Sequence, residues 1–158
     1  MAYKSSGDAA ALAGFFADLV RCETRLYNAL NDRLRERHGI VTSQFEYLRL
    51  LRDRPGARVA DLATEFAIGI GATSKGIDRL EQRGLVARRP NPADRRSSLL
   101  ELTEAGAELA AAASETFGEC LAALMGGTFE GDRLAAAARA MGELRAALER
   151  GQVGMPTG

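Results

Sequence analysis

The chain has 158 residues, 46% hydrophobic and 27% charged, and its 21 basic residues balance its 21 acidic ones. This composition is typical of one soluble domain with a sizeable core, with or without accessory helices. It excludes a membrane-spanning protein, because no stretch approaches the roughly 18 continuous apolar residues that a bilayer requires. We therefore expect a cytoplasmic protein.

The first predicted element is a long helix over residues 8–39, capped by Asp8 and ended by His38 and Gly39. About thirty helical residues would extend roughly 45 Å, more than a compact domain of this size needs internally. Part of its apolar stripe should therefore pack against something else. The stripe comprises Leu12, Phe15, Phe16, Leu19, Cys22, Leu26, Leu30 and Leu34. We expect residues 1–7 before it to be disordered.

Two shorter helices follow. Thr42 or Ser43 caps the first of them, which ends at residues 54–56, where proline and glycine interrupt the helix. The second spans residues 59–66, and the sequence Ile-Gly-Ile at residues 68–70 makes a tight connection to a further helix.

Residues 70–103 predict a helix followed by a two-stranded hairpin. Thr73, Ile77 and Leu80 recur at helical spacing on one face, and Gly84 occupies the left-handed position that ends a helix. Residues 85–87 and 98–102 read as two strands, joined by a loop with Arg95 and Arg96 at its tip. Residues 40–103 thus predict a winged helix-turn-helix DNA-binding domain.

The charge distribution supports nucleic-acid binding although the net charge is zero. Residues 75–96 contain seven basic and three acidic residues, a net charge of +4, which leaves −4 for the rest of the chain. A local cationic patch on an acidic body is the electrostatic footprint of a nucleic-acid-binding surface. On an isolated helix, the same row of basic residues would indicate only a solvated face.

Two further helices complete the chain. Thr103 caps one that stops at Gly126 and Gly127, and the last runs from Phe129 to Arg150, followed by a tail, residues 151–158, that we expect to be disordered. The fold class is therefore mainly α with a small two-stranded antiparallel wing. The helices in 8–39 and 104–150 are predicted to form a dimerisation region, because the simplest partner for their apolar faces is a second copy of the chain. In the alternative, a monomer, the terminal helices pack only on each other.

The candidate DNA contacts divide by position. Thr73, Ser74 and Lys75 lie in the first turns of the helix, where base edges are read. Arg79 and Arg83 lie further along and suit phosphate, as do Arg95 and Arg96 at the wing tip. We expect Asp94 to hold one of these arginines by a charge-assisted hydrogen bond. Gly76 inside the helix costs roughly 1 kcal/mol against alanine and has no explanation in the sequence.

The sequence lacks the patterns of other chemistries. The segment from Gly69 to Ser74 resembles a dinucleotide-binding fingerprint but follows no strand and lacks the third glycine. His38 is the only histidine, so we predict no metal site, no cofactor and no catalytic residues. Cys22 and Cys120 are far apart on helical segments, and we expect both to be small buried thiols.

Four segments together resemble the MarR-type winged helix-turn-helix regulators: residues 43–51, 80–89, 92–96 and 100–106. The resemblance implies a homodimer that binds a palindromic operator, most often as a repressor released by a phenolic or other small lipophilic ligand. It implies a ligand pocket near Phe16, Arg21 and Tyr47. By position, the family's DNA contacts correspond to Gly71, Ala72, Ser74, Lys75, Asp94, Arg95 and Arg96.

Two alternatives remain open. One is a thiol-based redox-sensing regulator that uses Cys22, although the tyrosines that activate such a cysteine in the family are missing from residues 42–45. The other is a winged-helix protein-interaction module without DNA binding, against which the intact set of Lys75, Arg95 and Arg96 counts.

Overall fold

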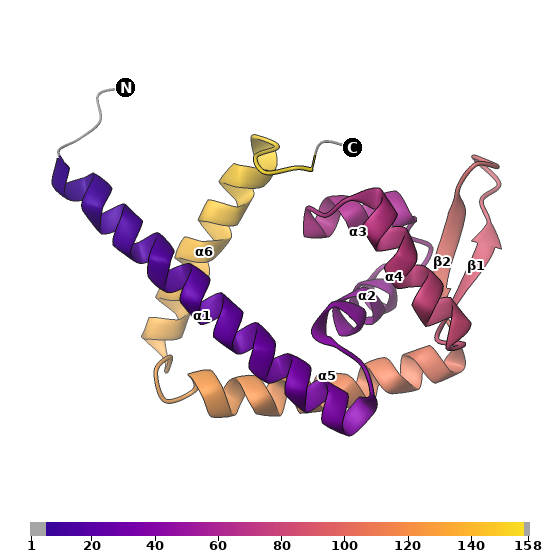
Figure 1. Ribbon diagram of the computed structural model, residues 1–158, viewed down its shortest axis with the longest axis horizontal. Coiled ribbons are helices and arrows are strands. Elements are labelled where there is room, and N and C mark those ends of the chain that lie inside the picture. Colours follow the sequence, from indigo (N-terminus) through magenta and orange to yellow (C-terminus); the bar gives the residue numbers. More distant parts are fainter. Residues whose placement is uncertain (1–5, 157–158) are drawn as a thin grey trace.

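A computed structural model describes residues 6–156 of the chain, so residues 1–5 and 157–158 of the expected tails lie outside it. The predicted fold class is confirmed: the described part is mainly helical with a two-stranded antiparallel sheet (Figure 1). In chain order its elements are α1 (Ser6–His38), α2 (Thr42–Asp53), α3 (Val59–Phe66), α4 (Ile70–Gln82), β1 (Val86–Pro90), β2 (Ser98–Leu102), α5 (Glu104–Met125) and α6 (Asp132–Arg150).

Three helix starts differ from the prediction. Helix α1 begins at Ser6, so Asp8 lies inside its first turn, where a carboxylate still favours the helix dipole. Val41, and not Thr42 or Ser43, is the capping residue of α2. The N–H group of Val41 donates to the Gln44 side chain at 3.1 Å. Helix α6 begins at Asp132 instead of Phe129, because the chain turns at Gly131 with a φ of +49°.

The core lies between the winged module, residues 40–102, and helix α5, where α2 packs against α4, α5 and β2. Its fully buried side chains come from all of these elements and from the end of α1. Phe45 of α2 packs on Phe117 of α5 with ring centroids 4.8 Å apart, and the Arg49 guanidinium covers both rings. Helix α5 thereby forms the base on which the winged module sits (Figure 1).

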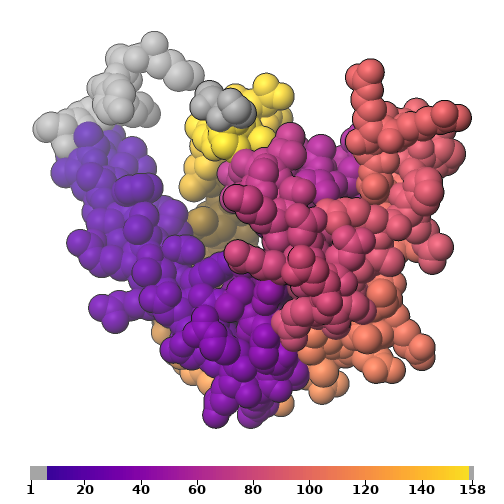
Figure 2. All heavy atoms as spheres, turned by 45° about the vertical axis from the view of Figure 1, so that its right-hand side comes forward, coloured from indigo at the N-terminus to yellow at the C-terminus, as the bar shows by residue number. Residues whose placement is uncertain are grey.

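The N-terminal half of α1 and all of α6 stand apart from this core (Figure 1). No residue of α6 is buried, and large apolar side chains are exposed on both helices. Together with the end of α5 they enclose an apolar groove of about 890 Å³. Figure 2 shows α1 at one side of the molecule and the wing projecting at the other. Within residues 6–156, no helix combines the length and apolar character needed to cross a bilayer.

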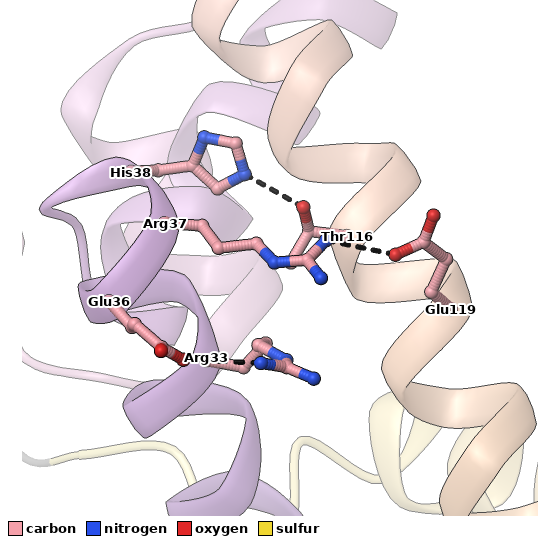
Figure 3. Close-up of polar contacts among 6 residues, drawn as sticks. All are labelled: Arg33, Glu36, Arg37, His38, Thr116 and Glu119. Atoms are coloured by element: carbon pink, nitrogen blue, oxygen red, sulfur yellow. Dashed lines mark hydrogen bonds and ion pairs between the residues drawn. The ribbon is translucent and has the colours of Figure 1, made fainter.

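Polar contacts fasten the end of α1 to α5. His38 Nε2 lies 2.8 Å from Oγ1 of the buried Thr116, and the Arg37 guanidinium donates to Glu119 at 3.0 Å (Figure 3). Both contacts come from the last turn of α1, and they hold the helix where it enters the winged module.

Candidate nucleic-acid interface

Helix α4 is built to expose its first turns. Its core face consists of Thr73, Ile77 and Leu80, all 0% exposed, and it ends where Gly84 adopts a φ of +70°. The Thr73 hydroxyl donates to the Gly69 carbonyl at 3.0 Å. Thr73, which was predicted to contact DNA, has no accessible surface in this structure, and its side chain closes the turn at the start of α4 instead.

The remaining residues predicted for DNA contact on α4 differ in accessibility. Gly71, Ala72, Lys75 and Arg79 are exposed, and Ser74 is half-buried. A Cβ built on Gly71 would meet no atom within 4 Å. The first two turns thus present the exposed Ile70, several small side chains and one lysine to solvent.

The wing is anchored to the rest of the module at its base. Val86 pairs with Leu102 and Pro90 with Ser98 across the antiparallel ladder. The N–H group of Gly56, in the loop before α3, donates to the Leu100 carbonyl at 2.9 Å. This fixes the sheet against the helices and leaves only the hairpin tip projecting.

Asp94 organises the wing tip in a different way from the one expected. Its Oδ1 accepts the backbone N–H of Arg96 at 2.9 Å, instead of a guanidinium. Asn91 closes the other side of the loop, with its amide donating to Ser97 Oγ at 2.9 Å. The carboxylate therefore shapes the backbone and leaves the side chains of Arg95 and Arg96 exposed.

The basic residues of the patch fall into two groups, which the sequence did not separate. Arg89 pairs with Glu101 across the sheet, Arg88 pairs with both Asp78 and Glu81, and Arg83 donates to the Gly39 carbonyl at 3.1 Å. Among the described residues, the side chains of the second group form neither an ion pair nor a hydrogen bond: they are Lys75, Arg79, Arg95 and Arg96. The cations available to an anionic partner are thus those of the exposed α4 face and the wing tip.

The residues predicted for a ligand site lie in different surroundings. Tyr47 is buried against Phe66, with ring centroids 5.6 Å apart. Burial raises the pKa of the Tyr47 hydroxyl, and a hydrogen bond with Thr73 offsets only part of this rise. Phe16 and Arg21 are exposed on the projecting half of α1. None of the three lines the apolar groove between α1, α5 and α6. A ligand site at these positions stays a prediction.

Cys22 is exposed and lines that groove, contrary to the expectation of a buried thiol. The reason is that its stretch of α1 projects beyond the core of this chain. Cys120 is half-buried. In the described part of the chain, no cluster of three histidine, cysteine or acidic side chains could hold a metal ion.

Comparisons with known proteins agree with this geometry. A model of the MarR family matches residues 40–98. The chain is 28% identical to the HTH-type transcriptional regulator MhqR of Bacillus subtilis over 86 residues, which cover 52% of this chain and 59% of MhqR. It is 30% identical to the multiple antibiotic resistance protein MarR of Escherichia coli over 100 residues, covering 61% and 69% of the two chains.

A solved structure extends the similarity to the whole fold. Sco3205, a MarR family transcriptional regulator from Streptomyces coelicolor in complex with DNA, superposes with a TM-score of 0.82 at 18% identity. The superposition covers 99% of this chain and 96% of that one. The terminal helices are therefore included in the likeness, beyond the segment that the family model matches.

Proposed function

Because the chain belongs to the MarR family, we propose that it is a homodimeric, sequence-specific DNA-binding transcriptional regulator that acts in the cytoplasm. It represses transcription from a palindromic operator and is released by a small phenolic or lipophilic ligand. The observation that carries the DNA-binding proposal is the placement of four unpaired cations on the open face of α4 and at the wing tip.

Helix α4 supplies the sequence reading. Its first turns enter the major groove, where Ser74 and Lys75 reach base edges and the small residues Gly71 and Ala72 allow close approach. Arg79, further along the same face, suits a phosphate. The wing tip places Arg95 and Arg96 on the backbone or in the adjacent minor groove.

Dimerisation is supported by the apolar surface of the terminal helices. Phe15 and Phe16 of α1 and Leu134, Leu144 and Leu148 of α6 are 42–65% exposed, although they lie at core-like helical spacing. Patches of this kind on a soluble protein mark interaction sites. A second copy would cover them by two-fold symmetry and place two copies of α4 at a fixed separation, as a palindrome requires.

The proposed function is tested by selecting bound duplexes from a random pool. We expect an inverted repeat with half-sites about one helical turn apart. Lys75→Ala should change the selected bases. Arg95→Ala should weaken binding to every duplex and lower the slope of log affinity against log salt by about 0.9, as expected for one lost phosphate contact. Arg139→Ala on α6 makes the same charge change away from the module and serves as the control. A pool without enrichment would overturn the proposal.

A further inference from the structure

We propose that Arg88 is a positioning residue that fixes the wing to helix α4 and is not itself a DNA contact, an inference that rests on the proposed DNA-binding function. Arg88 lies on β1, and its Nη2 donates to Asp78 Oδ1 at 2.7 Å while its Nη1 contacts the Glu81 carboxylate. Both carboxylates belong to α4. One guanidinium therefore joins the reading helix to the wing.

The arrangement is specific to a guanidinium. Asp78 and Glu81 are three residues apart and so lie side by side on one face of α4. A planar fork with several N–H donors can bridge two carboxylates at once, whereas a lysine is a single point charge. The Arg88 side chain is only 25% exposed. Burial lowers the pKa of Arg88, but the hydrogen bonds and attraction from Asp78 and Glu81 more than compensate and raise it overall.

The same contacts keep negative charge away from the proposed DNA surface. Asp78 and Glu81 share the helix with Lys75 and Arg79, and two uncompensated carboxylates there would repel phosphate. A phosphate contact by Arg88 would have to break both of its ion pairs. Arg88 thus contributes to binding by neutralising α4 and by holding the wing at a fixed angle to it.

Salt titrations separate this role from a direct contact. We compare Arg88→Gln with Arg95→Gln, which removes the same charge at the wing tip. Arg88→Gln should weaken operator binding roughly tenfold, because the wing is no longer held to α4 and two carboxylates are left uncompensated, while the salt slope should fall by less than in Arg95→Gln. Arg95→Gln should lower the slope by about 0.9. An equal fall of the slope in both variants, or wild-type affinity in Arg88→Gln, would overturn the proposal.

Hydrogen exchange of the wing amides tests the clamp without DNA. Exchange of the amides of residues 86–89 should rise in Arg88→Gln and stay at the wild-type rate in Arg95→Gln. In an Asp78→Asn, Glu81→Gln background, Arg88→Gln should add no further increase, because its partners are already lost. A further increase there, or unchanged exchange in the single variant, would overturn the proposal. A wild-type chain that binds no duplex would contradict the proposed function and leave this measurement intact.

Discussion

A Cβ atom added to Gly76 would stand 2.7 Å from Cε2 of Tyr47, well inside van der Waals contact. The Tyr47 ring is itself held edge-on against Phe66, so it has little room to withdraw. The contact explains a glycine in the interior of α4. Helix α4 gives up about 1 kcal/mol of helix propensity at this position and in return packs directly on the buried ring from α2.

Gly76→Ala should therefore destabilise the fold. Overpacking of a buried site costs about 1–3 kcal/mol, which outweighs the propensity gain of about 1 kcal/mol, and we expect a net loss of about 1 kcal/mol. Urea unfolding at one fixed chain concentration measures it. In a Tyr47→Leu background the same substitution should become neutral or stabilising, because the ring has gone. A Gly76→Ala chain more stable than wild type would contradict this account.

At Gly106, near the start of α5, a neighbouring stretch of backbone lies even closer than the Tyr47 ring lies to Gly76. A Cβ there would lie 1.9 Å from the Leu85 carbonyl oxygen, and that carbonyl already accepts the Thr103 N–H at 3.1 Å. Backbone has no rotamer with which to give way, so Gly106→Ala should cost about 3 kcal/mol or more, or prevent folding. Gly118→Ala in the same helix meets no atom within 4 Å and should stabilise by up to about 1 kcal/mol. Thermal unfolding and soluble yield should rank the two variants in opposite directions from wild type.

The contrast between these glycines shows what periodicity could predict. Spacing and turn residues located α3, β2 and the end of α4 at Gly84, because those features are local in sequence. Gly76 is explained only by Tyr47, which lies 29 residues earlier in the chain, and no local pattern reveals such a contact. The prediction also counted Arg88 as part of a uniform cationic patch, since pairing depends on how the hairpin folds back on α4.

For Asp94, we expect a change in DNA affinity opposite in sign to the one that its charge alone predicts. Removing a carboxylate from the wing should favour DNA, yet Asp94→Ala also removes the acceptor for the Arg96 N–H and loosens the tip. We expect Asp94→Ala to weaken operator binding about threefold to tenfold, which corresponds to about 0.6–1.4 kcal/mol, the net contribution of one ordinary hydrogen bond. Asp94→Asn keeps an acceptor oxygen and should bind as tightly as wild type or more tightly. Equal gains in both variants, measured by fluorescence anisotropy, would show that the turn contributes nothing.

The exposed stripe of α6 predicts the assembly state. Leu148 is 42% exposed on this helix, and Leu148→Glu should shift the sedimentation coefficient from that of a dimer toward that of a monomer, because a carboxylate would have to be buried between the copies. Ile70 is 62% exposed at the start of α4, outside the proposed dimer interface. Ile70→Glu should therefore sediment as the wild type does. A monomeric wild-type chain at micromolar concentration would contradict the dimer.

Asp61 at the start of α3 makes stability depend on pH. It accepts hydrogen bonds from the Arg58 guanidinium at 2.8 and 3.1 Å and from the Arg58 backbone N–H at 2.7 Å. These contacts, the side-chain one first, lower the pKa of Asp61. A carboxylate whose pKa is lowered by folding stabilises the fold at pH values above its unfolded pKa of about 3.9. This contribution is lost as the pH falls through the lower pKa of the folded state.

Asp61→Ala should therefore cost about 1 kcal/mol of unfolding free energy at neutral pH, the usual effect of losing a helix-start acceptor. The difference from wild type should shrink as the pH drops below about 4, because the protonated wild-type side chain no longer forms the ion pair. Asp61→Asn retains an acceptor without the charge, so its loss at neutral pH should be smaller, and its difference from wild type should likewise shrink as the wild-type carboxylate is protonated. Chemical unfolding at a series of pH values measures all three chains. A constant gap between Asp61→Ala and wild type down to pH values well below the folded pKa would mean that the carboxylate charge does not stabilise α3.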